Sequence, residues 1–157
     1  MSILIYTDGS CKKNPGLGGY AAIVIIEGQY YPVSGHEENT TNNRMEMIAA
    51  LKALEFVQKI RGDDWIKDDI FLYSDSNYLI TGCTDWMRGW IKSNWKNNRL
   101  KNRDLWKQFA PYVLSDNRIR FGWIKEHDGN QLNEWVDKLA RRAWEAVSPS
   151  KRKRRKR

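Results

Sequence analysis

The chain has 157 residues, 41% of them hydrophobic, and eight tryptophans, which is enough to build one folded domain with a buried core. It contains no run of about 18 apolar residues that would span a membrane, no signal-peptide pattern, and only two cysteines, Cys11 and Cys83. The composition therefore excludes a membrane span and a disulfide framework, and it predicts a cytoplasmic protein.

The formal net charge of +8 is unevenly distributed along the chain. Residues 1–85 hold 7 basic and 12 acidic groups, whereas residues 86–107 hold seven basic groups and one acidic group. Residues 151–157 are all Lys or Arg. This polarity predicts an acidic half that binds cations and a basic half that binds a polyanion.

The first predicted strand covers residues 4–8 and ends on a carboxylate, Asp8, before a turn over residues 9–16. Strands over 18–26 and 30–35 complete an antiparallel meander, and Pro32 places its strand at an edge. A carboxylate at the end of a buried strand needs a cation or hydrogen-bond donors. Donors from its own turn are a sufficient partner if Asp8 is considered alone.

A helix is predicted to start near Asn42 or Asn43 and to continue through Ile60, because apolar residues recur there at helical spacing. Glu46 lies on this helix, three residues after Asn43. It is either a capping-box partner or a carboxylate at the rim of the buried face.

Residues 68–76 repeat the opening pattern, since an apolar strand again ends on a carboxylate, Asp75, before a short helix over 77–82. If the two strands are parallel neighbours, Asp8 and Asp75 lie side by side at the same sheet edge.

The segment from Trp86 to Trp95 interleaves indoles with basic side chains. It is either an amphipathic helix that buries its tryptophans or a basic, aromatic surface for nucleic acid. A helix from Leu105, a strand over 118–124 and a polar loop over 125–131 follow. The last helix places Asp137 on its rim and is predicted to bury Leu132, Trp135, Val136, Leu139, Ala140, Ala143 and Trp144.

Four carboxylates, Asp8, Glu46, Asp75 and Asp137, thus come from two strand ends and two helix rims. Brought together they repel one another unless divalent cations lie between them, and an all-oxygen set favours Mg²⁺. Two such ions activate water and stabilise the leaving oxygen in phosphodiester hydrolysis. Glycoside hydrolysis, the metal-free alternative, needs only two carboxylates and no basic half.

Four motifs, in order along residues 2–147, resemble type 1 ribonuclease H. They are Tyr6-Thr7-Asp8-Gly9-Ser10-Cys11 with Asn14-Pro15-Gly16, Thr40-Thr41-Asn42-Asn43-Arg44-Met45-Glu46, Tyr73-Ser74-Asp75-Ser76, and His127-Asp128-Gly129 with Asn133 and Asp137. The resemblance implies an α/β ribonuclease H-like fold with a five-stranded mixed sheet flanked by helices. It also implies Mg²⁺-dependent hydrolysis of the RNA strand of an RNA/DNA hybrid, with 5′-phosphate and 3′-hydroxyl ends.

By this resemblance Asp8, Glu46, Asp75 and Asp137 hold two Mg²⁺ ions, for which Mn²⁺ is a substitute. Asp8 bridges the ions, Glu46 binds the ion near the leaving group, and Asp75 with Asp137 binds the ion that activates water. His127 is a proton shuttle that helps the product leave, although a histidine in a polar loop is also an ordinary surface residue.

The resemblance also assigns substrate contacts. The residues that it assigns to RNA 2′-hydroxyls are Cys11, Asn14, Asn42 and Asn43. A DNA-phosphate pocket is formed by Thr41 and Asn102, and the aromatic side chains along the DNA channel are Tyr78 and Trp90. The segment from Trp86 to Arg103 resembles the family's basic protrusion.

The sequence departs from the family at Asn39, where many members have a basic residue, and at Glu126 and Asp128, which add negative charge beside His127. The predicted catalytic domain covers residues 1–147, and residues 148–157 form a basic tail predicted to be disordered. We expect a monomer with no membrane or protein partner. A catalytically dead hybrid binder and the nuclease part of a reverse transcriptase or recombinase are the competing interpretations.

Overall fold

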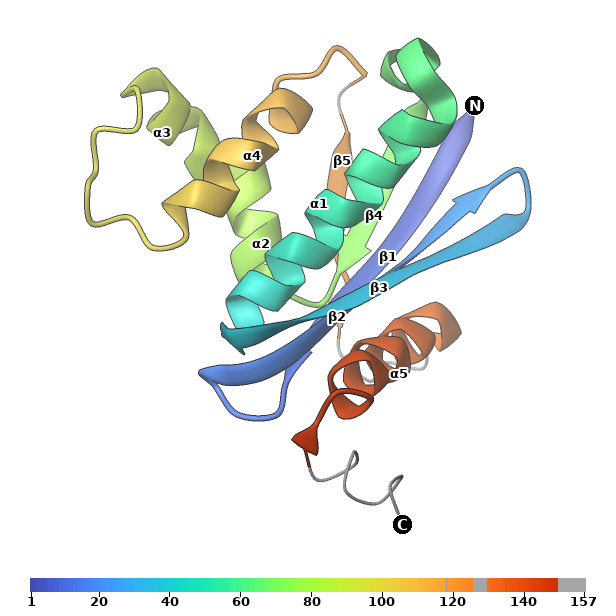
Figure 1. Ribbon diagram of the computed structural model, residues 1–157. Helices are drawn as coiled ribbons and strands as arrows, with labels where there is room; N and C mark the ends of the chain where they lie inside the picture. The colour runs from blue at the N-terminus through green and yellow to red at the C-terminus, as the bar shows by residue number, and fades with distance from the viewer. Residues whose placement is uncertain (118, 126–129, 150–157) are drawn as a thin grey trace.

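The computed structural model describes residues 1–117, 119–125 and 130–149, and it shows a five-stranded sheet with helices on both faces (Figure 1). The strand order is β3-β2-β1-β4-β5. Both parallel and antiparallel pairs occur, which confirms the predicted mixed sheet. Within the described residues, no helix is both long and apolar enough to cross a membrane.

The antiparallel meander is confirmed and consists of β1 (Ser2–Cys11), β2 (Gly16–Ile26) and β3 (Gln29–Thr40). Glu27 and Gly28 connect β2 to β3 with φ of 49° and 76°, the positive values that a tight two-residue hairpin turn requires. β3 is an edge strand, as Pro32 predicted. It runs to Thr40 rather than ending at residue 35, because its pairing with β2 continues to Gly16.

The carboxyl ends of two parallel strands meet at the centre of the sheet. β4 (Asp69–Ser74) pairs in parallel with β1, and Thr7 lies opposite Ser74. Asp8 follows Thr7 and Asp75 follows Ser74, so the predicted proximity of the two strand ends is confirmed. β5 (Arg120–Trp123) pairs in parallel with β4 and forms the other edge.

One face of the sheet packs against α1 (Asn42–Arg61). The helix begins where the sequence predicted, but its N-cap is Thr41, whose Oγ1 accepts the backbone N–H of Arg44 at 3.2 Å. The capping-box interpretation of Glu46 is wrong, because that motif needs the acid three residues after the cap and Glu46 stands five residues after it. Side chains buried between α1 and the sheet include Ile3, Ile5, Val24, Met45, Ala50, Leu54, Ile70 and Leu72.

The opposite face of the sheet packs against α5 (Gln131–Glu145), which crosses β1, β2 and β3 (Figure 1). Gly19 of β2 permits this approach, since a Cβ there would collide with the carbonyl oxygen of Ala140. Of the seven residues predicted to be buried on this helix, Val136 and Ala140 are buried and Trp135 is 39% exposed, while the other four are half-buried: Leu132, Leu139, Ala143 and Trp144. Trp135 packs beside Tyr30 of β3 with ring centroids 6.1 Å apart, and Tyr30 is itself exposed, so this contact does not shield the indole from solvent.

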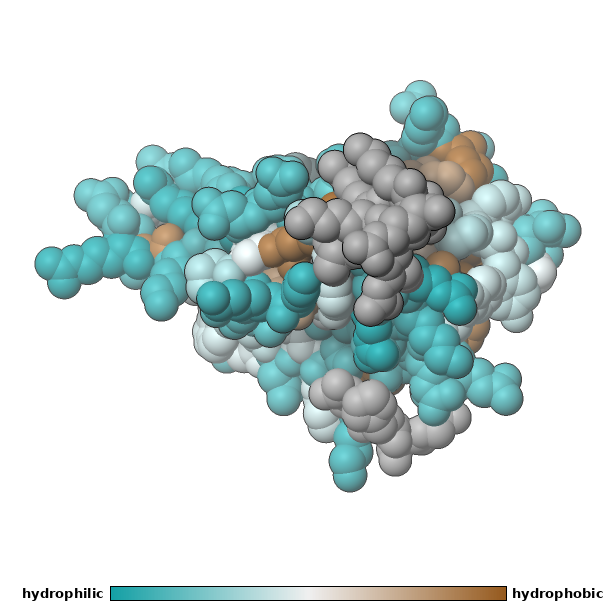
Figure 2. Space-filling view, turned by 60° about the horizontal axis from the view of Figure 1, so that its bottom comes forward, coloured by the Kyte–Doolittle hydropathy of each residue, from teal (hydrophilic) through white to brown (hydrophobic). Residues whose placement is uncertain are grey.

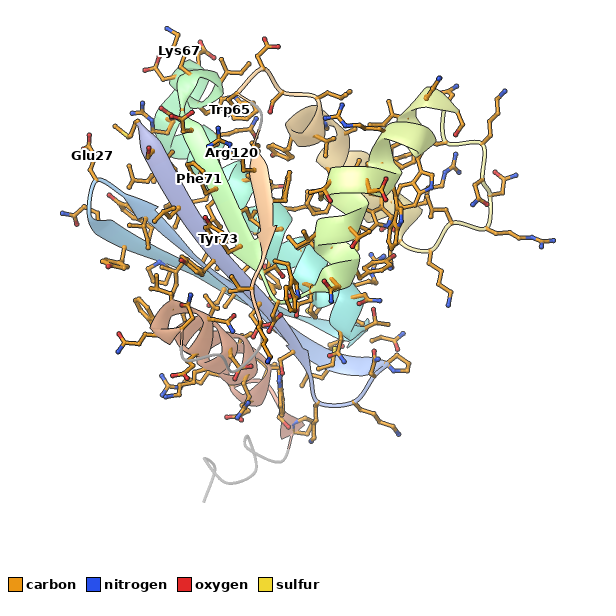
Figure 3. The ribbon with its side chains drawn as sticks, turned by 180° about the vertical axis from the view of Figure 1, so that it is seen from behind. Glu27, Trp65, Lys67, Phe71, Tyr73 and Arg120 are labelled. Atoms are coloured by element: carbon orange, nitrogen blue, oxygen red, sulfur yellow. The ribbon has the colours of Figure 1, made fainter. Side chains whose placement is uncertain are left out.

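The part of this face over β4 and β5 carries aromatic side chains instead. Figure 3 shows Phe71 and Tyr73 on β4 and Arg120 on the adjacent β5. The Arg120 guanidinium lies 5.0 Å from the centre of the Phe71 ring, and Tyr73 stacks on Tyr6 of β1 at 5.3 Å.

A short helical segment, η1 (Gly62–Lys67), follows α1 directly. The protrusion and the helices beside it are formed by α2 (Asn77–Thr81), η2 (Gly82–Trp86), α3 (Met87–Lys92) and α4 (Arg103–Val113). The predicted helix over residues 86–95 is only partly right, because α3 ends at Lys92 and Trp95 has a positive φ of 58°. The protrusion at the left of Figure 1 presents a largely hydrophilic surface, as Figure 2 shows.

Candidate active site

Three carboxylates meet at the central strand ends. Asp8, Glu46 and Asp75 each offer an oxygen atom, and these atoms lie within 4.8 Å of one another. Asp8 and Glu46 are buried, whereas Asp75 is half-buried. Glu46 comes from the first turns of α1, so the site joins two strands to a helix.

Gly9 brings the helix to the strand end. A Cβ on Gly9 would lie 2.5 Å from the backbone nitrogen of Glu46, a separation that no side chain tolerates. The Gly9 N–H also donates to Asp8 Oδ1 at 2.9 Å, so Asp8 accepts a bond from its own turn and joins the cluster as well. Because residue 9 has no side chain, the backbone of β1 approaches α1 closely enough for Asp8 and Glu46 to share one site.

The backbone around Asp75 is held from two sides. Its carbonyl oxygen accepts the indole N–H of Trp123 at 3.0 Å, which ties the end of β4 to β5. The next residue, Ser76, donates its backbone N–H to Ser74 Oγ at 3.0 Å and caps α2. These bonds hold the turn that presents Asp75 to the other two carboxylates.

Burial and mutual repulsion raise the pKa values of two carboxyl groups in the cluster. Burial, followed by the charge of Asp75, raises the pKa of Asp8 to about 8. Burial, with the charges of Asp8 and Asp75, likewise raises the pKa of Glu46. Glu46 Oε2 is buried and has no hydrogen-bond partner among the described residues. An unpartnered buried oxygen beside two further carboxylates fits a hard divalent cation, which would satisfy it and stabilise the ionised forms.

The fourth predicted carboxylate, Asp137, lies on α5 and is not one of the three that meet within 4.8 Å. Its Oδ2 accepts a hydrogen bond from Arg141 at 3.2 Å, one turn later on the helix. All four carboxylates nevertheless line one cleft of about 500 Å³. Its lining residues are Asp8, Gly9, Ser10, Cys11, Asn42, Asn43, Glu46, Asp75, Ser76, Asn77, Tyr78, Asp137 and Arg141.

Of the residues predicted to contact RNA, Cys11, Asn42 and Asn43 line this cleft, and Asn14 is hydrogen-bonded to Asn42. The backbone N–H of Cys11 donates to Asn42 Oδ1 at 3.0 Å, and the backbone N–H of Asn42 donates to Asn14 Oδ1 at 3.2 Å. These bonds join the β1–β2 turn to the start of α1. Asn14, Asn42 and Asn43 are exposed, so their remaining polar atoms face solvent.

The residues predicted to contact DNA form a second group. Asn102 precedes α4, and its Nδ2 donates to the hydroxyl of Tyr78 at 3.1 Å. Trp90 packs among Trp86, Trp95 and Trp106, with ring centroids 5.4 to 6.2 Å apart. Of this group only Tyr78 lines the cleft. Tyr78, Trp90 and Asn102 thus come from the segment between α2 and the start of α4, whereas Thr41, the fourth member of the group, is the N-cap of α1.

The sequence analysis missed two arginines. Arg141 lines the cleft, and its position four residues after Asp137 was a readable signal for an ion pair on one helix face. Arg44 contacts Asn102 across 58 residues of sequence, and no local pattern predicts that contact. His127 and the basic run 151–157 lie outside the described residues.

Comparison with known proteins places this arrangement in a family. The family model described as RNase H matches residues 1–145, which include all five residues predicted to be catalytic. The chain belongs to the ribonuclease H family.

Curated relatives agree over most of the sequence. The chain is 41% identical over 145 residues to a ribonuclease H of Francisella philomiragia, with 90% of each chain covered. It is 40% identical over 144 residues to a ribonuclease H of Francisella tularensis subspecies novicida, again with 90% of each covered.

Several solved structures share the fold of this chain. LC11-RNase H1, isolated from compost, is 27% identical with a TM-score of 0.68, covering 94% of this chain and 99% of that one. The same enzyme has been solved in complex with an RNA/DNA hybrid, at 25% identity, a TM-score of 0.68, and coverage of 93% and 99%. LC9-RNase H1 has a TM-score of 0.78 at 24% identity, covering 94% of this chain and 74% of that one, and this likeness shows the fold.

Proposed function

We propose that this protein hydrolyses the RNA strand of RNA/DNA hybrids by two-metal-ion catalysis and leaves 5′-phosphate and 3′-hydroxyl ends. The observation that carries the proposal is the cluster of Asp8, Glu46 and Asp75 within 4.8 Å in a member of the ribonuclease H family. The hybrid complex of the similar LC11-RNase H1 supports the substrate.

The four carboxylates are the residues that would hold the ions. Asp8, Glu46 and Asp75 already present oxygens to one another, and Asp137 lines the same cleft. Because the pKa of Asp8 is raised to about 8, this residue must release a proton before it binds a cation at neutral pH. When bound, Mg²⁺ or Mn²⁺ supplies the charge that activates water and stabilises the leaving oxygen.

Two groups of side chains in and beside the cleft select the substrate. Cys11, Asn14, Asn42 and Asn43 lie on the β1–β2 turn and the start of α1, and we assign to them the RNA 2′-hydroxyls that distinguish RNA from DNA. Thr41 and Asn102 hold a phosphate of the DNA strand, while Tyr78 and Trp90 lie along its sugars. The proposed RNA contacts thus adjoin the carboxylates, whereas the proposed DNA contacts extend from the N-cap of α1 toward the protrusion.

Proton transfer is assigned to His127. A histidine changes charge near neutral pH and is suited to take a proton from the attacking water and to give it up as the product leaves. The residue is not needed to hold an ion in this scheme, because four carboxylates are present.

The test is a cleavage assay with Mg²⁺ on an end-labelled RNA/DNA hybrid beside matched RNA/RNA and DNA/DNA duplexes. We expect cleavage of the RNA strand in the hybrid alone. Ligation and kinase-labelling assays should identify 5′-phosphate and 3′-hydroxyl ends on the products. Hybrid binding without cleavage would instead identify a catalytically dead binder. Cleavage of all three duplexes would refute the assignment of Cys11, Asn14, Asn42 and Asn43 to RNA 2′-hydroxyls.

A further inference from the structure

Asn102 has an unusual backbone for a residue that precedes a helix. N-cap residues are normally extended and use their side chain to accept a helix N–H. Asn102 is instead left-handed, with φ of 59° and ψ of 26°, and its side chain makes no cap hydrogen bond to α4. Its amide group is therefore directed to other partners, and those partners determine where it points.

One partner is Arg44 of α1. Arg44 NH1 donates to Asn102 Oδ1 at 3.2 Å and to Asp104 Oδ1 at 3.0 Å, while NH2 donates to Asp104 Oδ2 at 2.9 Å. The pairing with Asp104 is bidentate, the geometry that gives an arginine-carboxylate pair its directional strength. The backbone N–H of the same Arg44 donates to Thr41 Oγ1. Arg44 thus contacts both residues assigned to the DNA-phosphate pocket.

The other partner is the hydroxyl of Tyr78, which accepts from Asn102 Nδ2 at 3.1 Å and from the Trp106 indole at 3.2 Å. Oδ1 of Asn102 faces the Arg44 guanidinium, which is a hydrogen-bond donor. Turning the amide over would place the Asn102 NH₂ group, a second donor, against this guanidinium. One of its two N–H bonds is used, and the other makes no hydrogen bond within the described part of the chain. The network leaves a single oriented donor.

The positive charge of Arg44 is paired with the carboxylate of Asp104 in this network. Its hydrogen bonds lower the pKa of Asp104, and Asp104 raises the pKa of Arg44, so both stay ionised across the physiological range. With Asn39 in the place of the basic residue found in many relatives, the pocket relies on the neutral donors of Thr41 and Asn102. Neutral donors bind a phosphate more tightly when their direction is fixed before binding, because less conformational freedom is lost.

On the basis of the proposed function, we propose that Arg44 and Asp104 are positioning residues that fix the Asn102 amide toward one phosphate of the DNA strand. The alternative is a purely structural tie between α1 and the protrusion. Replacing Arg44 distinguishes the two roles, because loss of a structural tie affects every substrate contact alike, whereas loss of a positioning residue affects one phosphate.

The experiment measures binding and cleavage of hybrids in which one DNA phosphate at a time is replaced by an uncharged methylphosphonate. For the native protein we expect one position at which the replacement weakens binding about 10-fold, the value of a single hydrogen bond to a charged group. In Arg44→Gln, the methylphosphonate at that position should change hybrid binding by no more than about 2-fold. KM of this variant for the unmodified hybrid should rise about 10-fold, with little change in kcat. Asp104→Asn should reproduce the pattern, and Arg44→Lys should restore it incompletely because lysine cannot pair in a bidentate way.

The matched control is Arg61→Gln at the other end of α1. Arg61 makes a similar bidentate pair with the buried Asp68, at 2.7 and 3.1 Å, far from the pocket. This variant should lower Tm and leave the methylphosphonate profile unchanged. The proposal is overturned if Arg44→Gln and Asp104→Asn keep the native profile, or if Arg61→Gln loses the same position. Binding is recorded separately from cleavage, so a protein that binds hybrids without cutting them refutes the proposed function and still decides the role of Arg44.

Discussion

Arg141 donates a hydrogen bond to Asp137 Oδ2 at 3.2 Å, and both side chains line the cleft that contains the three clustered carboxylates. Both residues are partly exposed, with side-chain exposed fractions of 54% and 30%. The Arg141 guanidinium is hydrogen-bonded to one oxygen of Asp137, the carboxylate that we assign to the water-activating ion. A cation approaching Asp137 therefore competes with Arg141.

This competition leads to the first prediction. Arg141→Gln should tighten the weaker of two Mg²⁺ binding events by about 2- to 5-fold, the range expected for a partly exposed ion pair. Isothermal titration calorimetry or NMR titration with Mg²⁺ measures the effect without any substrate. Lys138→Gln on the same helix removes an equal charge that does not line the cleft, and it should change the affinity less. Equal effects of the two variants would show that only the net charge matters.

Asp8→Asn tests the cluster itself. The amide cannot serve as an anionic ligand shared by two ions, so we expect cleavage to fall below detection. Its folded state, however, should be more stable than the native one in EDTA at pH 8, because the repulsion among Asp8, Glu46 and Asp75 is reduced. Thermal unfolding and a cleavage assay measure the two effects. Substantial Mg²⁺-dependent turnover by this variant is the result that contradicts the two-ion assignment.

The raised pKa of Asp8 predicts an unusual dependence of stability on pH in the absence of divalent ions. An unfolded aspartate releases its proton near pH 4, whereas folded Asp8 retains it up to about pH 8. Between these values the folded state binds more protons, so the free energy of unfolding decreases as pH rises, by up to about 1.4 kcal/mol per pH unit.

Denaturant titrations in EDTA from pH 5 to 8 measure this slope. Asp8→Asn is the matched control, and the difference between the two proteins isolates the contribution of Asp8 and of the carboxylates coupled to it. Saturating Mg²⁺ should reduce the slope of the native protein, because a bound cation favours the ionised form. A difference that is flat across this range would show that Asp8 titrates normally.

The basic run 151–157 is predicted to bind substrate phosphates, and the structure indicates where to remove it. Ser148 is buried and its Oγ lies 3.3 Å from Lys12 Nζ on the β1–β2 turn, so a truncation is best placed after Pro149. This variant should bind the hybrid more weakly at low salt, with turnover at saturating substrate nearly unchanged. The slope of log affinity against log salt should flatten by about 0.7 to 0.9 for each phosphate that the run neutralises in the full chain. An unchanged slope would leave the run a solubilising or localisation tail.

Much of the site was readable in the sequence, because strand ends are local features. The runs that end on Asp8 and Asp75 predicted two buried strands, and the parallel register of β1 and β4 then placed both carboxylates at one edge. Helical periodicity likewise located α1 and α5, and with them Glu46 and Asp137. These inferences depend on period and position along the chain, which the amino-acid order alone contains.

Tertiary packing decided the rest. Glu46 reaches Asp8 only because Gly9 lets two backbones approach, and Trp135 stays exposed beside Tyr30, which is also at the surface. Arg44 meets Asn102 and Asp104 across 58 and 60 residues, through a left-handed residue that no periodicity signals. Sequence by itself determined which side chains stand at the ends and faces of elements, since those follow from local geometry. Which of them touch was decided by the packing of distant elements, whose close approaches and long-range hydrogen bonds depend on the whole fold.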